Sequence, residues 1–138
     1  MPGRPESAAR HTVPNRSAMA PFLPLRAWRL AFVLSLAGVL VLSLAPATPA
    51  SLTTGWDKTN HLLGFAVLGL LGLWSYPGRT VTVLLGLLAY GGLIEVLQSL
   101  TPYRLAEWAD LLADALGLLL GAVLARLFMR KPPPGRPD

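Results

Sequence analysis

The sequence predicts an all-α, polytopic membrane protein: a four-transmembrane-helix bundle with short loops and both termini in the cytoplasm. Of its 138 residues, 53% are hydrophobic and only 14% are charged, whereas about 25% is the usual charged share in soluble domains. The apolar residues fall in four runs, each near the ~20 residues that a helix needs to cross a bilayer. The runs do not alternate as barrel strands do, so a helix is the structure that satisfies their backbone in lipid.

Each apolar run is followed by a proline, which cannot continue a helix because it lacks the backbone N–H and its ring clashes with the preceding turn. These prolines are Pro46, Pro77, Pro102 and Pro132. The predicted helices cover about residues 28–45, 59–76, 80–100 and 108–128. We predict three parts of the chain: a flexible basic N-terminal tail (1–26), a four-helix transmembrane domain (27–129) and a proline-rich basic C-terminal tail (130–138).

The beginning of the chain leaves two alternatives open. Translation could start at Met19, because a basic flank and an apolar run follow it directly. The first apolar run could also be a cleaved signal peptide, since Ala45-Pro46-Ala47 has the small-x-small form of a cleavage site. The run is slightly longer than a usual signal core, and a proline lies within the candidate cleavage site. Both points favour a retained helix.

The positions of Lys and Arg predict the orientation in the membrane, because these residues accumulate in cytoplasmic loops. Of the 12 Lys and Arg residues, only Lys58 and Arg104 fall on one side of the predicted bundle. The others flank the first helix, lie at Arg79 between the second and third helices, or follow the fourth helix. Both termini are therefore predicted to be cytoplasmic, in a multi-pass protein of the bacterial inner membrane. The net charge of +5 sums two unlike faces, so it does not predict a nucleic-acid partner.

Polar residues concentrate at the outer ends of the last three helices, although each is costly within hydrocarbon. They open the second predicted helix, close the third and lead into the fourth. The set is Asp57, Lys58, His61, Glu95, Gln98, Arg104, Glu107, Asp110 and Asp114. At a rise of ~1.5 Å per residue, the deepest of them lie only about 10 Å below the helix ends. We expect a polar vestibule, open to the outside, in which three helices meet.

The spacing of these residues supports their convergence. Asp57 and His61 are four residues apart and share a helix face. On the fourth helix, Asp110 and Asp114 continue into Gly117 and Gly121 along one stripe. Such glycines permit close approach between helix backbones, so we expect this stripe to face the bundle interior. The alternative for any single polar residue is a structural role, in which Lys58 or Arg104 neutralises an acid and His61 or Gln98 hydrogen-bonds across helices.

These residues resemble the VanZ-like family of small bacterial membrane proteins. The resemblance rests on Asp57-Lys58-x-x-His61 and Glu95-x-x-Gln98, followed by Arg104, Asp110, Gly117 and Gly121, and on LSLAP before the first outer loop. It covers about residues 30–128. One position departs from it, because Asp114 stands where the family usually has Asn. The resemblance implies a cell-envelope protein whose founding member lowers susceptibility to the glycopeptide teicoplanin; it implies no particular activity and does not by itself assign resistance.

Two functions compete for the polar vestibule. The first is binding, without catalysis, of an envelope lipid, a lipid-linked precursor or a glycopeptide-related head group, with Lys58 and Arg104 on its anionic part. The second is a membrane-embedded hydrolase or transferase, with His61 as general base and Glu95 or Asp110 orienting it. The expected ligand-binding residues are Asp57, Lys58, His61, Glu95, Gln98, Arg104, Asp110 and Asp114. Whether the protein is an enzyme stays open.

Other classes of function have less support. No cofactor and no metal site are predicted: oxygen-rich ligands could come from His61, Glu95, Asp110 and Asp114, but no helix has the His spacing of a known metal motif. Ion or proton transport would need polar groups through the inner part of the helices, where Tyr90 is the single candidate, or an interface in a homo-oligomer. The expected partners are therefore the lipid bilayer and an envelope precursor.

Overall fold

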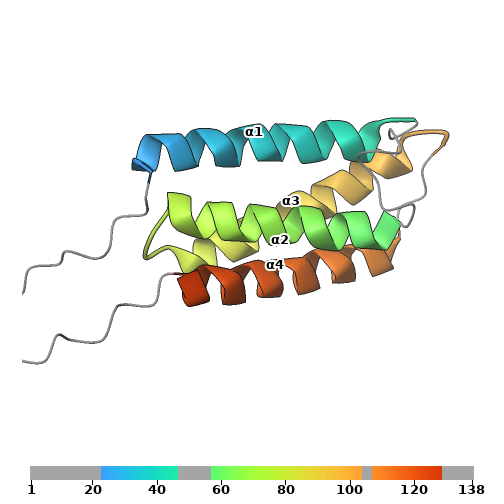
Figure 1. The fold of residues 1–138 in the computed structure, drawn as a ribbon. Coiled ribbons are helices and arrows are strands. Elements are labelled where there is room, and N and C mark those ends of the chain that lie inside the picture. The colour runs from blue at the N-terminus through green and yellow to red at the C-terminus, as the bar shows by residue number, and fades with distance from the viewer. Residues whose placement is uncertain (1–22, 47–56, 104–106, 129–138) are drawn as a thin grey trace, which may run out of the picture.

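Four helices form the protein in a computed structural model, which describes residues 23–46, 57–103 and 107–128. Helix α1 spans Leu25–Leu44, α2 Asp57–Ser75, α3 Thr80–Ser99 and α4 Trp108–Phe128. The helices run alternately up and down the bundle (Figure 1). This arrangement confirms the predicted all-α, four-helix fold, and the helix ends differ from the predicted ones by at most three residues. The predicted tails lie almost wholly outside the described residues.

Helices α1, α3 and α4 are each long and apolar enough to cross a membrane. Many of their large apolar side chains are exposed, including Leu34, Leu85 and Leu119, as lipid-facing residues should be. Helix α2 does not belong to this apolar group, because it opens with the polar sequence DKTNH. It contacts all three other helices, which cover much of its surface. The chain is thus a multi-pass membrane protein, whereas the side on which its termini lie stays a prediction.

The closest packing is between α2 and α4 (Figure 1). A β-carbon at Gly117 would collide with the carbonyl oxygen of Leu62, and one at Gly121 with that of Ala66. Both glycines are buried, which confirms that their stripe faces the bundle interior. Such close contact between the two backbones fixes both the rotation and the depth of α4 against α2. It therefore determines which side chains of the two helices meet.

The apolar core lies in the middle of the bundle. Phe65, Leu68, Leu87, Ile94 and Leu118 come from α2, α3 and α4 and are buried together. Partly buried side chains of α1 pack against this cluster from one side, and none of the residues of α1, all of them described, is itself buried. Helix α1 is thus the most peripheral of the four. It lies over α2 and α3 and leaves more of its surface to lipid.

The two ends of the bundle carry opposite charge. The end where α2 and α4 begin holds the described carboxylates, which are Asp57, Glu95, Glu107, Asp110 and Asp114, together with Lys58. The end where α1 and α3 begin holds the described arginines, which are Arg26, Arg29, Arg79 and Arg126. We call them the acidic end and the basic end. They lie at the right and the left of the bundle in Figure 1, respectively.

Candidate functional site

The acidic end contains a buried polar cluster contributed by three helices. Asp57, Lys58 and His61 come from the start of α2, Glu95 from near the end of α3, and Asp110 and Asp114 from the first turns of α4. The exposed fraction is 6% for His61, 9% for Glu95, 2% for Asp110 and 0% for Asp114. The structure thus brings most of the predicted site residues together. Arg104, which was predicted with them, lies outside the described residues.

A hydrogen-bonded pair of His61 and Asp114 forms the centre of this cluster. His61 Nδ1 lies 2.9 Å from Asp114 Oδ1, and both side chains are buried. An ionised Asp114 accepts the Nδ1–H proton, which fixes the tautomer and the orientation of the ring. The ring also lies parallel to that of Phe65, at an interplanar angle of 4°. Both contacts hold the imidazole so that its other nitrogen, Nε2, faces α3.

Glu95 approaches that second nitrogen from α3. Its Oε1 lies 4.0 Å from His61 Nε2, and its Oε2 accepts a hydrogen bond of 2.9 Å from the backbone N–H of Glu107. One carboxylate therefore has two roles. It holds the segment leading into α4, and it presents an oxygen toward the imidazole. At hydrogen-bond distance from His61, however, the structure places Asp114 rather than Glu95 or Asp110.

Lys58 joins the start of α2 to the start of α4. Its Nζ lies 2.6 Å from Glu107 Oε2 and 3.6 Å from Asp110 Oδ1. Glu107 is half exposed, so this pair sits where water screens it, whereas Asp110 is buried beneath it. Lys58 thus pairs with two acids of α4 and the segment before it, as in its structural alternative. The ammonium group forms a cationic cap over the cluster.

Three ligand atoms in the cluster have the spacing of a cation site. A carboxylate oxygen from each of Asp57 and Asp110 and a ring nitrogen of His61 all lie within 4.8 Å of one another. The set differs from the one considered from sequence, since Asp57 takes the place of Glu95 and Asp114. A bound cation would compete with the Lys58 ammonium, which already gives positive charge to Asp110. A cation bound by these atoms would have to share Asp110 with Lys58 or displace the ammonium group.

Gln98 serves a different contact. Its Nε2 donates a hydrogen bond of 3.0 Å to the backbone carbonyl of Ser43 in α1. Tyr103 donates in the same way to the carbonyl of Leu44, at 3.2 Å. Both bonds satisfy carbonyls at the end of α1, which have no partner within their own helix. Gln98 thus hydrogen-bonds across helices, as in its structural alternative, and holds α1 against α3.

A family model described as VanZ/LLP1 matches residues 6–129 of the chain. The chain belongs to the VanZ/LLP1 family. The match covers all four helices and every residue of the polar cluster, so the resemblance seen in the sequence is confirmed. No curated protein and no solved structure matches the chain.

In this VanZ/LLP1 protein, the cluster retains unused capacity for hydrogen bonds. Within the described residues, four buried side-chain oxygens of the acidic end have no hydrogen-bond partner: Glu95 Oε1, Gln98 Oε1, Asp110 Oδ1 and Asp114 Oδ2. A buried polar atom without a partner costs roughly 1–3 kcal/mol. Three of these atoms are carboxylate oxygens around His61. They can accept hydrogen bonds from hydroxyl or ammonium groups, or from a proton that the acids share.

Gly91 is a residue of the candidate site that sequence reasoning missed. A β-carbon at this position would collide with Asp114 Oδ2 and would come within 3.1 Å of the Phe65 ring. Glycine therefore leaves the space in which the Asp114 carboxylate lies. The available signal was its spacing, because Gly91 precedes Glu95 by four residues and so lies one turn below it on the same helix face.

Proposed function

We propose that this VanZ/LLP1 protein binds the polar head group of an envelope lipid, or of a lipid-linked wall precursor, at its acidic end. The observation that carries the proposal is the set of buried carboxylate oxygens around His61 that form no hydrogen bond within the described residues. Sugar hydroxyls and ammonium groups donate the hydrogen bonds that these oxygens accept. Lys58 and Arg104 supply the cations for an anionic part of the same ligand. A purely structural network would leave fewer such acceptors, because unsatisfied buried groups destabilise the fold.

The proposal includes the membrane and its orientation. The basic end lies in the cytoplasm, the acidic end faces outward, and the membrane is the bacterial inner membrane. The motivation is the separation of charge between the two ends, since Lys and Arg mark cytoplasmic segments. Reporter fusions after Arg79 and after Tyr103 test it. We expect the first to report the cytoplasm and the second the outside, and the reverse result would overturn the orientation.

Crosslinking tests the binding proposal. A photoreactive benzoyl-phenylalanine in place of Trp108, which is exposed at the acidic end, should capture a lipid-linked wall precursor in native membranes. The matched control places the same group at Leu116, an exposed apolar position of α4, where only bulk phospholipid should be captured. The adduct at position 108 should disappear in the Glu95→Gln variant. Equal adducts at both positions would refute binding at the acidic end.

A change in susceptibility to teicoplanin-type glycopeptides is the cellular consequence that we propose for binding of a wall precursor. Deleting the gene from its native host should alter the inhibitory concentration of teicoplanin, and the wild-type gene should restore it. The Glu95→Gln gene should fail to restore it at equal membrane levels. If the Glu95→Gln gene restored the inhibitory concentration, any effect on teicoplanin susceptibility would not depend on the acidic end.

Catalysis is the second candidate, and one specific observation favours it. His61 is oriented by a buried carboxylate at 2.9 Å, as a general base must be, and its Nε2 faces the cluster. Such a base would activate water or a hydroxyl against a lipid-linked substrate. Purified protein incubated with a lipid-linked wall precursor should then form product, and His61→Gln should abolish turnover but retain binding. If the wild-type protein bound the precursor without turning it over, the binding proposal would stand and catalysis would be excluded.

Transport has the least support. Among the described residues, the charged groups lie at the two ends of the bundle. Tyr90 lies between them, and its hydroxyl donates to the Leu36 carbonyl at 2.6 Å. A proton pathway needs a chain of polar groups, and one tyrosine bound to a backbone carbonyl does not supply it.

A further inference from the structure

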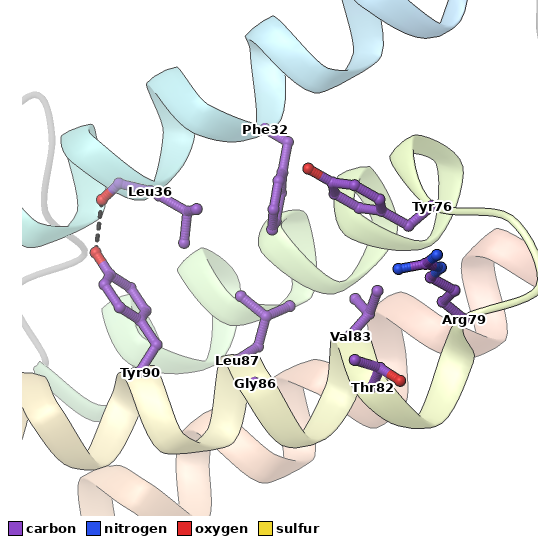
Figure 2. Close-up of a pocket in the computed structure, with 9 residues that line it drawn as sticks. All are labelled: Phe32, Leu36, Tyr76, Arg79, Thr82, Val83, Gly86, Leu87 and Tyr90. Carbon is purple, nitrogen blue, oxygen red and sulfur yellow. Dashed lines mark hydrogen bonds between the residues drawn. The ribbon is translucent and has the colours of Figure 1, made fainter.

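A second candidate site lies away from the acidic cluster, between α1 and α3 (Figure 2). It is a groove of about 390 Å³ that extends from Tyr76 and Arg79 to Tyr90. Phe32 and Leu36 of α1 line it on one side, and side chains of α3 line it on the other. Its walls are almost entirely apolar. A cavity of this kind in a membrane protein suits a hydrocarbon chain.

The groove is open along α3 because one residue there has no side chain. Gly86 lies in the groove lining, and a β-carbon at this position would meet nothing within 4 Å. Figure 2 shows Val83 and Leu87 of α3 extending toward α1 on either side of this gap. At one end the hydrogen bond from Tyr90 to Leu36 links α3 to α1. The groove thus runs from a charged end at Arg79 to this link between the two helices.

The polar end carries positive charge. Arg79 is exposed, and within the described part of the chain it forms no ion pair. Arg29 lies nearby, with its guanidinium carbon 5.3 Å from the centre of the Tyr76 ring. Arg79 is also the N-cap residue of α3, and its side chain does not cap the helix. The guanidinium attracts an anion to this end, and the first backbone N–H groups of α3 therefore strengthen that attraction.

The length of the groove matches one leaflet of a bilayer. Arg79 and Tyr90 are eleven residues apart on one helix, which corresponds to about 16 Å at the helical rise. Half of a hydrocarbon core is about 15 Å. A phosphate at Arg79 would therefore place an acyl chain along Val83, Gly86 and Leu87, with its end near Tyr90. The charge at one end and the apolar wall along the rest fit the two parts of an anionic phospholipid.

We propose that this groove binds one acyl chain of an anionic phospholipid whose phosphate pairs with Arg79. The site begins at the basic end and shares no residue with the acidic cluster, so it is independent of the binding proposed there. Bound lipid would fill the space between α1 and α3 and hold the peripheral helix in place. The protein would thus take a structural lipid from the leaflet at its basic end.

Native mass spectrometry of the full-length protein in mild detergent tests this proposal, with dioleoyl phosphatidylglycerol and dioleoyl phosphatidylcholine as probes. Gly86→Phe places an aromatic ring in the groove and should lower the affinity for phosphatidylglycerol at least tenfold. Gly92→Phe is the matched control, because Gly92 also lies on α3, also has open space at its β-carbon and is not part of the groove. This control should bind phosphatidylglycerol as the wild type does.

Arg79→Gln gives an independent measurement that does not depend on the tolerance of Gly86→Phe. It should lower the preference for phosphatidylglycerol over phosphatidylcholine by about fivefold, the effect of one arginine near an anionic lipid surface. Unchanged preference in Arg79→Gln would overturn the role of the arginine. Equal loss of binding in Gly86→Phe and Gly92→Phe, or loss in neither, would show that lipid contacts the bundle without occupying the groove and would refute the proposal.

Discussion

The acidic end and the basic end of the bundle use charge in different ways. At the acidic end, His61, Glu95, Asp110 and Asp114 are buried, and His61 of α2 lies between Glu95 of α3 and Asp114 of α4. At the basic end, Arg79 and Arg126 are exposed, and no described carboxylate pairs with them. Exposed arginines at a helix end orient the chain and attract anionic lipid. Charges buried between helices are costly unless they pair, which makes this cluster the candidate functional site.

The largest effect should follow from breaking the buried pair of the acidic end. Asp114→Leu leaves the His61 ring without its partner, and we expect it to destabilise the protein by about 3–5 kcal/mol, the usual consequence of removing one partner of a buried pair. Asp114→Asn is the control, because an amide oxygen can still accept from His61 Nδ1. Unfolding in mixed micelles by added SDS, followed by circular dichroism, measures the difference. Similar midpoints for Leu and Asn would contradict the account of this pair.

Packing between α2 and α4 should have the next largest effect. Gly117→Val places side-chain atoms against the Leu62 carbonyl and should cost about 1–3 kcal/mol, as overpacking does. It should also separate His61 from Asp114, because Gly117 lies one turn below Asp114 on α4. Gly38→Val, at a position of α1 with open space, is the control. The same unfolding assay applies, and equal destabilisation by both variants would show that the close approach is unimportant.

A change at the basic end should have the smallest effect. Arg29→Met removes the guanidinium that lies over the Tyr76 ring and its 3.4 Å hydrogen bond to the Ser75 carbonyl. An exposed cation–π contact is worth about 0.5–1 kcal/mol, so the unfolding midpoint should move little. A loss as large as that of Asp114→Leu would show that the basic end is as structural as the acidic end. The claim that the two ends differ in their contribution to stability would then be wrong.

The fold could be predicted from the sequence because a bilayer dictates the length of each helix and prolines mark where each one stops. The four helices are confirmed, although α2 is less apolar than the other three. Its polar first turn is tolerated because α2 contacts every other helix and its polar residues lie at the end of the bundle. The sequence predicts a membrane-spanning helix with a polar start in this segment. It does not show that other helices surround it.

The members of the site could be predicted, but their pairing could not. Spacing placed His61, Asp110 and Asp114 on interior faces, and they are buried there. Which acid reaches His61 depends on the depth and rotation of α4 against α2, which Gly117 sets by its contact with the Leu62 carbonyl. Gln98 belongs to the same helix face as Glu95 but bonds to α1, because the end of α1 presents the carbonyl of Ser43. Such distances come from packing and not from spacing along the chain.

The central claim is that the acidic end binds a ligand and is more than a structural network. Glu95→Gln tests it most directly, because the amide keeps an oxygen that can accept from the Glu107 N–H and removes the carboxylate facing His61. The measurement pairs capture of lipid-linked wall precursor at position 108 with the amount of folded protein recovered in detergent. We predict loss of capture at an unchanged folded amount. Retained capture, or a fall in folded protein that accounts for the loss, would contradict the claim.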